Sequence, residues 1–172
     1  MKKTFLLAFI ILLGVSLFGC KNVGNDTQQP QQNDVSNEAA ADSIVYRNTQ
    51  YDFSFSLPVT WKDYSIVTDK WEGLAIGSSE IVETGPMISI RHPQWNPENR
   101  RQDIPIMIFT LDQWSSLQQG KFHIGAAPVG PKELGRNTGY VFALPARYNF
   151  AFPPGYEEVE KIIESNPLQT NK

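Results

Sequence analysis

Histidine and cysteine are scarce in this sequence, and their scarcity argues against several kinds of chemistry. Two histidines, His92 and His123, and one cysteine, Cys20, occur among the 172 residues. A zinc site needs three or four ligands, and an activated nucleophile needs a base beside it. The sequence also has no Gly-x-Ser-x-Gly elbow and no glycine-rich phosphate loop. We therefore expect no metal site, no cofactor and no catalytic residue, and a binding module is favoured over an enzyme.

Clustered basic residues are absent as well. The chain carries 15 Lys and Arg residues against 18 Asp and Glu residues, and no long basic run occurs anywhere. Nucleic acid is bound mainly through clustered positive charge. We therefore expect no nucleic-acid partner.

Long hydrophobic runs are limited to residues 5–18, which follow the positively charged Lys2 and Lys3. A spanning helix needs roughly 20 apolar residues, so this shorter run is typical of a signal peptide. The run closes with Leu17-Phe18-Gly19-Cys20, which resembles the lipobox of bacterial lipoproteins. The resemblance implies that residues 1–19 are a lipoprotein signal peptide and that Cys20 is lipidated and becomes the mature N-terminus.

The rest of the composition agrees with an anchor at Cys20. Two or more acyl chains hold a protein durably on a membrane, whereas one chain holds it only marginally. Because Cys20 is the only cysteine, no disulfide can form inside the domain. Cleavage removes two lysines and leaves 13 bases against 18 acids, a net charge of −5. We expect an acidic protein on the extracytoplasmic face of the cell membrane.

Residues 20–43 are predicted to be the lipidated cysteine and a disordered tether. This segment has no aromatic residue, is rich in Gln and Asn, and carries four acids against one base. Such a composition cannot bury enough apolar area to offset the entropy of ordering.

The alternation of residues 53–57 predicts a half-buried strand over residues 50–57. Phe53, Phe55 and Leu57 alternate with two serines, and Pro58 cannot donate to a ladder and so ends the strand. Similar β-branched or alternating patterns predict the remaining strands at 44–46, 65–69, 73–76, 87–92, 104–110, 132–134 and 138–144. Residues 77–86 and 93–103 are predicted as loops.

Two helices follow from capping and periodicity. Thr110 and Gln113 have the spacing of a capping box, which predicts a helix that ends at Gly120. Residues 156–165 have acids in the first turn and an apolar face, which predicts a second helix. The sequence therefore predicts one α+β domain at 44–165, with a mostly antiparallel sheet of about seven strands and helices on its faces, and a flexible tail at 166–172.

The motif Phe53-x-Phe55-x-Leu57-Pro58-x-x-Trp61 resembles that of PsbP/Mog1-like domains, which occur in many bacterial lipoproteins. The resemblance implies an antiparallel sheet covered by helices on both sides. The chain is also similar to lipoproteins of low-GC Gram-positive bacteria to which no activity is assigned. The family shares no catalytic motif, so the resemblance assigns no functional residue.

Two segments are candidate partner surfaces. The first is the polar loop that contains Trp95, Arg100 and Arg101, because long loops are often functional and Trp and Arg are enriched at interaction hot spots. The alternative is that Trp95 folds back onto the core and the arginines are solvated. The second segment is the aromatic stretch at 147–156, for which plain packing under the last helix is the simpler explanation.

These patterns favour a non-enzymatic lipoprotein that binds an envelope protein or another envelope component. The alternative is a small-ligand-binding protein or an envelope enzyme, with a pocket between sheet and helix that no motif reveals.

Overall fold

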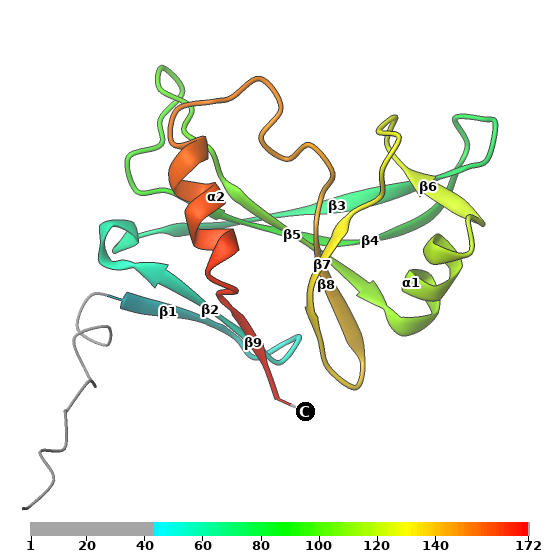
Figure 1. Ribbon diagram of the computed structural model, residues 1–172, viewed down its shortest axis with the longest axis horizontal. Coiled ribbons are helices and arrows are strands. Elements are labelled where there is room, and N and C mark those ends of the chain that lie inside the picture. Colours follow the sequence, from blue (N-terminus) through cyan, green and yellow to red (C-terminus); the bar gives the residue numbers. More distant parts are fainter. Residues whose placement is uncertain (1–42, 172) are drawn as a thin grey trace, which may run out of the picture. The chain divides into compact units, whose positions relative to one another are not determined.

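The computed structural model describes residues 43–171, which form two antiparallel sheets and two α-helices (Figure 1). The predicted signal peptide at 1–19, the lipidation site at Cys20 and all of the predicted tether except Ser43 lie outside the described residues. Ser43 itself begins the first strand.

The smaller sheet has the strand order β1–β2–β9 and consists of β1 (Ser43–Asn48), β2 (Phe53–Pro58) and β9 (Leu168–Thr170). The larger sheet has the order β6–β3–β4–β5–β8–β7. Its strands are β3 (Ser65–Ala75), β4 (Ile81–Arg91), β5 (Ile104–Thr110), β6 (Phe122–Ile124), β7 (Lys132–Arg136) and β8 (Tyr140–Leu144). The helices are α1 (Leu111–Gln118) and α2 (Tyr156–Glu164), and a short 3₁₀ turn, η1 (Val59–Trp61), follows β2.

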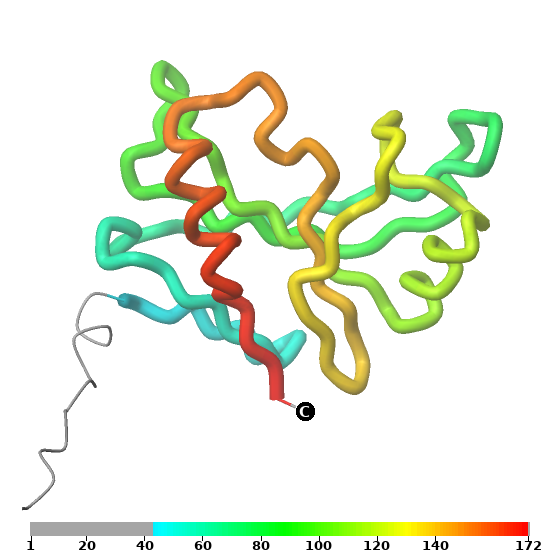
Figure 2. Tube along the Cα trace, in the orientation of Figure 1, coloured from blue at the N-terminus to red at the C-terminus, as the bar shows by residue number. Residues whose placement is uncertain are grey.

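The central strands of the larger sheet are buried on both faces, so apolar residues form a core on each side of the sheet. Along β5, Ile104, Ile106 and Ile108 belong to one apolar cluster, while Met107 and Phe109 belong to another. The first cluster, which we call the main core, also takes the apolar residues of β2 and α2. The second contains Trp114 of α1 and Phe122 of β6. Each helix therefore covers a different face of the sheet, and the tube in Figure 2 traces α1 and α2 to separate parts of the domain.

The α+β class, the antiparallel sheet and both helices were predicted correctly. The capping box of α1 is present, since Thr110 Oγ1 accepts a hydrogen bond from the Gln113 amide at 3.2 Å and Gln113 Oε1 accepts one from the Thr110 amide at 3.1 Å. The predicted core face of β2 is confirmed as well, because Phe53, Phe55 and Leu57 are all buried.

The expected single sheet of about seven strands is not found in the described residues, which form one sheet of six strands and a second of three. The segments 65–69 and 73–76 form one strand, β3, and the expected loop at 77–86 contains the first half of β4. A glycine in this position suggests a turn, but Gly85 lies within β4 and packs closely against the Trp71 ring. A Cβ at Gly85 would lie 2.5 Å from the Trp71 ring, so only glycine leaves room for this indole between the strands.

The tail is also not as predicted. Residues 166–172 were expected to be flexible, but Leu168 is buried in the main core and β9 pairs with β2. The Pro167 carbonyl accepts a hydrogen bond from the Ser56 amide at 3.0 Å. A single apolar residue in a short polar segment carries no periodic signal, so the sequence could not show this strand.

Candidate interaction surface

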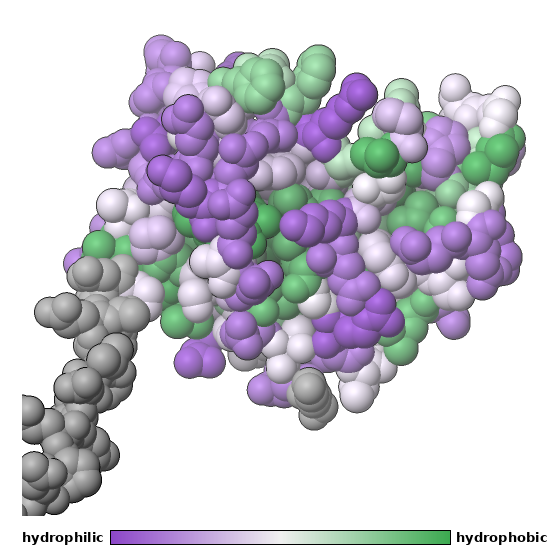
Figure 3. Space-filling model, viewed as in Figure 1, coloured by the Kyte–Doolittle hydropathy of each residue, from purple (hydrophilic) through white to green (hydrophobic). Residues whose placement is uncertain are grey.

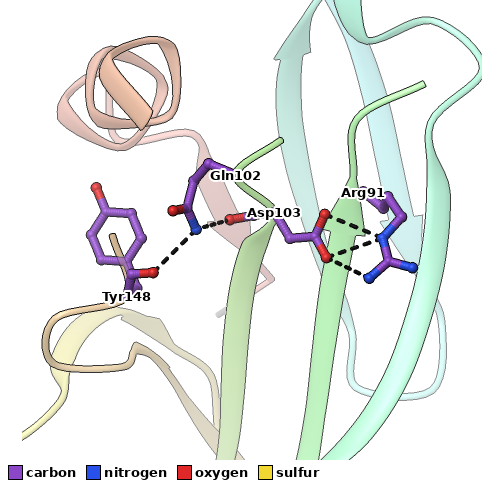
Figure 4. Close-up of polar contacts among 4 residues, drawn as sticks. All are labelled: Arg91, Gln102, Asp103 and Tyr148. Carbon is purple, nitrogen blue, oxygen red and sulfur yellow. Dashed lines mark hydrogen bonds and ion pairs between the residues drawn. The ribbon is translucent and has the colours of Figure 1, made fainter. Parts of the chain in front are cut away.

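The loop at 92–103 is held in place by Arg91, the last residue of β4. The Arg91 guanidinium lies 4.0 Å from the centroid of the Trp95 ring, a cation–π arrangement. The same guanidinium donates to both carboxylate oxygens of Asp103, with Nη2 2.8 Å from Oδ2 and Nε 3.3 Å from Oδ1 (Figure 4). Trp95 is half-buried. Its indole is therefore covered on one face by a side chain of this domain.

Arg101 ties the same loop to α2. Its Nη2 donates to Glu158 Oε2 at 3.0 Å, and the other carboxylate oxygen of Glu158 accepts from Trp61 Nε1 at 3.2 Å. Arg100, by contrast, is exposed. Of the three residues predicted as a partner surface, Trp95 and Arg101 therefore have intramolecular partners and Arg100 projects into solvent.

His92 is buried beneath this loop. It is 4 % exposed and its ring meets that of Trp61 edge-on, with the centroids 4.9 Å apart. Its Nδ1 accepts a hydrogen bond from the Gln94 amide at 3.0 Å, which leaves the proton of the neutral ring on Nε2. Burial lowers the pKa of His92 below its usual value of 6.5, the positive charge of Arg101 lowers it further, and Glu158 partly opposes this. His92 is thus a neutral packing residue that fixes the start of the loop.

The lowered pKa predicts a pH-dependent stability. The unfolded chain protonates His92 as the pH falls through 6.5, whereas the folded protein resists protonation. The stability contributed by His92 is therefore complete above that pH and is lost as the pH falls toward the folded-state value. Urea unfolding at pH 7.5 and pH 5.5 should show a smaller loss of stability for His92→Gln than for the wild type. Equal pH dependence in the two proteins would contradict this account.

His123 lies apart from His92 in the fold. It is in β6 at the edge of the larger sheet, and its Nδ1 lies 2.7 Å from the Gly125 carbonyl oxygen. Within residues 43–171, no group of three or more His, Cys, Asp or Glu side chains is arranged to hold a metal ion. Neither α1 nor α2 is long and apolar enough to cross a membrane.

A second loop, residues 145–155, is the most unusual surface feature, and we call it the aromatic loop. It leaves the end of β8 and returns to the start of α2 (Figure 2). Gln102 makes hydrogen bonds near both ends of the aromatic loop. The Gln102 amide donates to the Pro154 carbonyl at 2.8 Å, and its side-chain Nε2 donates to the Tyr148 carbonyl at 3.2 Å (Figure 4). Because the side chain of Gln102 is itself buried, these contacts fix the base of the loop.

The tip of the aromatic loop presents two phenylalanines to solvent. Phe150 is 76 % exposed and Phe152 is 68 % exposed, more than any other large apolar residue in the described part of the chain. The expectation that these aromatics pack under the last helix is therefore wrong for both, although Tyr148 does pack against the main core. The misleading signal was the aromatic composition of the stretch, because aromatic residues beside a helix start are usually buried.

The backbone of this tip is strained. Arg147, Ala151 and Phe152 have φ angles of 56°, 72° and 49°, in the left-handed region that non-glycine residues rarely adopt. Each such residue costs on the order of 1 kcal/mol and persists only where the surrounding structure imposes it. Two successive turns stabilise this conformation. The Phe150 amide donates to the Arg147 carbonyl, and the Phe152 amide donates to the Asn149 carbonyl. The fold thus maintains a strained backbone that holds two apolar rings in water.

A neighbouring loop extends this apolar surface. The loop at 125–131 and the aromatic loop enclose a groove of about 310 Å³, whose walls include Ala127 on one side and Phe150 on the other. Together the two loops contain no acid and one base, Arg147. Figure 3 shows apolar side chains gathered along the edge of the domain where the aromatic loop lies.

A separate groove of about 430 Å³ lies between β2 and α2. Leu57 and Ile162 supply apolar walls, and Glu158 and Lys161 supply charges. This groove is open to solvent and lies between sheet and helix, where the alternative interpretation of the sequence expected a pocket.

Comparison of the chain with models of known protein families, with curated proteins and with solved structures finds no match. The function must therefore be inferred from the residues and the geometry themselves.

Proposed function

We propose that this protein is a lipoprotein anchored at the extracytoplasmic face of the cell membrane through Cys20, and that its domain is a non-enzymatic binding module for an envelope component. The lipobox-like residues and the short apolar run before them support the anchor. The observation that supports binding is the outward display of Phe150 and Phe152 on a strained loop with a fixed base. Backbone strain of this kind is concentrated at functional sites.

The PsbP/Mog1-like assignment is part of this proposal. It rests on the motif of β2 and η1, in which Phe53, Phe55, Leu57 and Trp61 are all buried in the main core. A motif made of core residues bears on the fold and assigns no binding residue. The proposed site therefore depends on the aromatic loop alone.

The groove between β2 and α2 supports the alternative, a protein that binds a small apolar ligand. The surface of its walls is mainly apolar, and one acid, Glu158, and one base, Lys161, also line it. An occupant there would lie against β2 and α2 and would leave the aromatic loop free. The two functions therefore predict contacts at different places.

Photo-cross-linking in intact cells tests the proposed site. The photoreactive analogue p-benzoylphenylalanine is placed at position 152 in the full chain, where it retains the ring of Phe152. We expect a recurrent cross-linked product, lipid or protein, at a yield several-fold above that of a matched control. The control carries the same analogue at Leu111, another exposed apolar residue, which is 42 % exposed and lies in α1.

Equal yields at the two positions would contradict binding through the aromatic loop. Thermal stabilisation of the same protein by a small apolar ligand would then favour the groove between β2 and α2.

A further inference from the structure

We infer that the aromatic loop binds the lipid bilayer itself, with Phe150 and Phe152 inserted into the interfacial layer as a second membrane contact beside the lipid anchor. This inference rests on the proposed function and names the envelope component that the loop binds.

The shape and chemistry of the tip fit a bilayer better than a protein. Stable protein interfaces bury about 800 Å² on each partner and combine an apolar centre with a polar rim. The tip offers two rings on a projecting turn, and Asn149 beside them is already occupied, because its Nδ2 donates to Glu160 Oε1 at 2.6 Å. A bilayer interface requires no matching pocket and accepts apolar side chains directly.

The charge distribution agrees with a lipid surface. The mature chain has a net charge of −5, so most orientations of the domain would be repelled by anionic headgroups. The loops at 125–131 and 145–155 contain no acid, and Arg147 in the aromatic loop is basic. The nearest acids lie in α2, where Glu160 is hydrogen-bonded to Asn149, so the two loops meet an anionic membrane with less repulsion than the acidic surfaces of the domain do.

Because of the lipid anchor, a weak contact between the aromatic loop and the bilayer would be enough to orient the domain. The 22 residues between Cys20 and Ser43 span at most about 80 Å when extended, so the domain stays close to the bilayer. A second contact made by a tethered domain benefits from a high effective concentration. Two phenylalanines can then control the orientation of the domain even where they could not bind a membrane alone.

The loop is also arranged for insertion before any membrane is present. Gln102 fixes the base of the loop, and the left-handed conformations of Ala151 and Phe152 already direct the tip outward. The rings of Phe152 and Tyr156 meet edge-on with their centroids 5.0 Å apart, which further limits the motion of Phe152. Insertion would therefore cost little additional ordering.

The experiment places an environment-sensitive probe at the tip. Phe152→Cys is introduced in the full chain, the lipidated protein is purified from membranes, and its mass is measured to establish acylation. Because lipidated Cys20 has no free thiol, an NBD fluorophore then labels position 152 alone. The protein is reconstituted into protein-free vesicles of phosphatidylglycerol and phosphatidylethanolamine, some of which carry brominated acyl chains. Leu111→Cys, labelled in the same way, is the matched control.

We expect a blue-shifted emission at position 152 and bromine quenching several-fold stronger than at position 111. Replacing Phe150 by alanine in the Phe152→Cys protein should reduce the quenching about tenfold or more, given the apolar area that one phenylalanine buries. Equal quenching at the two labelled positions overturns the inference. Protection at position 152 in native membranes but not in protein-free vesicles also overturns it, because it identifies a protein partner and leaves the proposed function intact.

A chain recovered without acyl chains overturns the proposed anchor instead. The probe at position 152 is then measured on the unlipidated protein, with Cys20→Ser, which a histidine tag at its N-terminus tethers to the same vesicles through a nickel-chelating lipid. Protection of the probe there supports bilayer contact, and exposure to water contradicts it.

Discussion

Replacing Phe55 by alanine is expected to lower the free energy of unfolding by about 3–5 kcal/mol, the usual cost of removing a buried phenylalanine. Phe55 is 0 % exposed and belongs to the main core. It comes from β2 of the smaller sheet and packs in one cluster with Phe142 of the larger sheet and Val159 of α2. A cavity at this place would therefore weaken the contact between the two sheets and the helix that covers them.

Urea unfolding of the purified protein measures this loss. The matched control is Ser56→Ala, on the neighbouring residue, whose side chain points to the solvent face of the same strand. That change should stay within about 0.5 kcal/mol of the wild type, as surface substitutions usually do. A loss below about 1 kcal/mol in Phe55→Ala would mean that the smaller sheet is not integral to the core.

The parts of the fold that were predicted correctly depend on local signals. The alternation around Phe55 identifies a strand whatever it pairs with, and the Thr110 and Gln113 side chains cap their own helix. Acids in the first turn and the apolar face of Val159, Ile162 and Ile163 similarly define α2 within nine residues. In each case the physical cause lies within a few positions of the sequence.

The parts that were missed depend on distant contacts. Gly85 is in a strand because the Trp71 ring crosses it, and β6 forms because Phe122 packs with that same indole. The strand β9 exists because β2 offers it a free edge. No window of sequence around these residues contains the partner that decides their structure.

The candidate site shows the same division. Trp95, Arg101 and Phe150 are equally plausible contact residues by type, since each sits in a loop next to prolines or polar residues. Arg101 proves to be held by Glu158, which is 57 positions away in the chain. Phe150 has no comparable partner in the core cluster beneath it and remains exposed. Only the tertiary structure can distinguish an arginine that stabilises a loop from a phenylalanine that is free to bind.

Cys20→Ser is expected to abolish acylation of the protein completely. The lipid is expected at the thiol of the only cysteine, and the serine hydroxyl cannot replace it. Each buried methylene contributes about 0.8 kcal/mol, so two or more chains anchor stably and their loss removes the strongest membrane contact. Cells are fed an alkyne fatty acid, and the captured protein is tested for the label and for the mass of its N-terminus. Wild type should carry the label on a chain that begins at Cys20, and Cys20→Ser should carry none.

The double variant Phe150→Ala/Phe152→Ala separates the proposed contact of the aromatic loop from the proposed lipid anchor. It should be labelled as strongly as the wild type, because the tip of the aromatic loop is remote in sequence from Cys20 and from the lipobox-like residues before it. Its membrane-bound fraction should therefore equal that of the wild type, while the orientation of its domain changes. Label on Cys20→Ser, or its absence from the wild type, would contradict the anchor. A double variant that loses the label would instead show that the loop acts before lipidation, during export or processing.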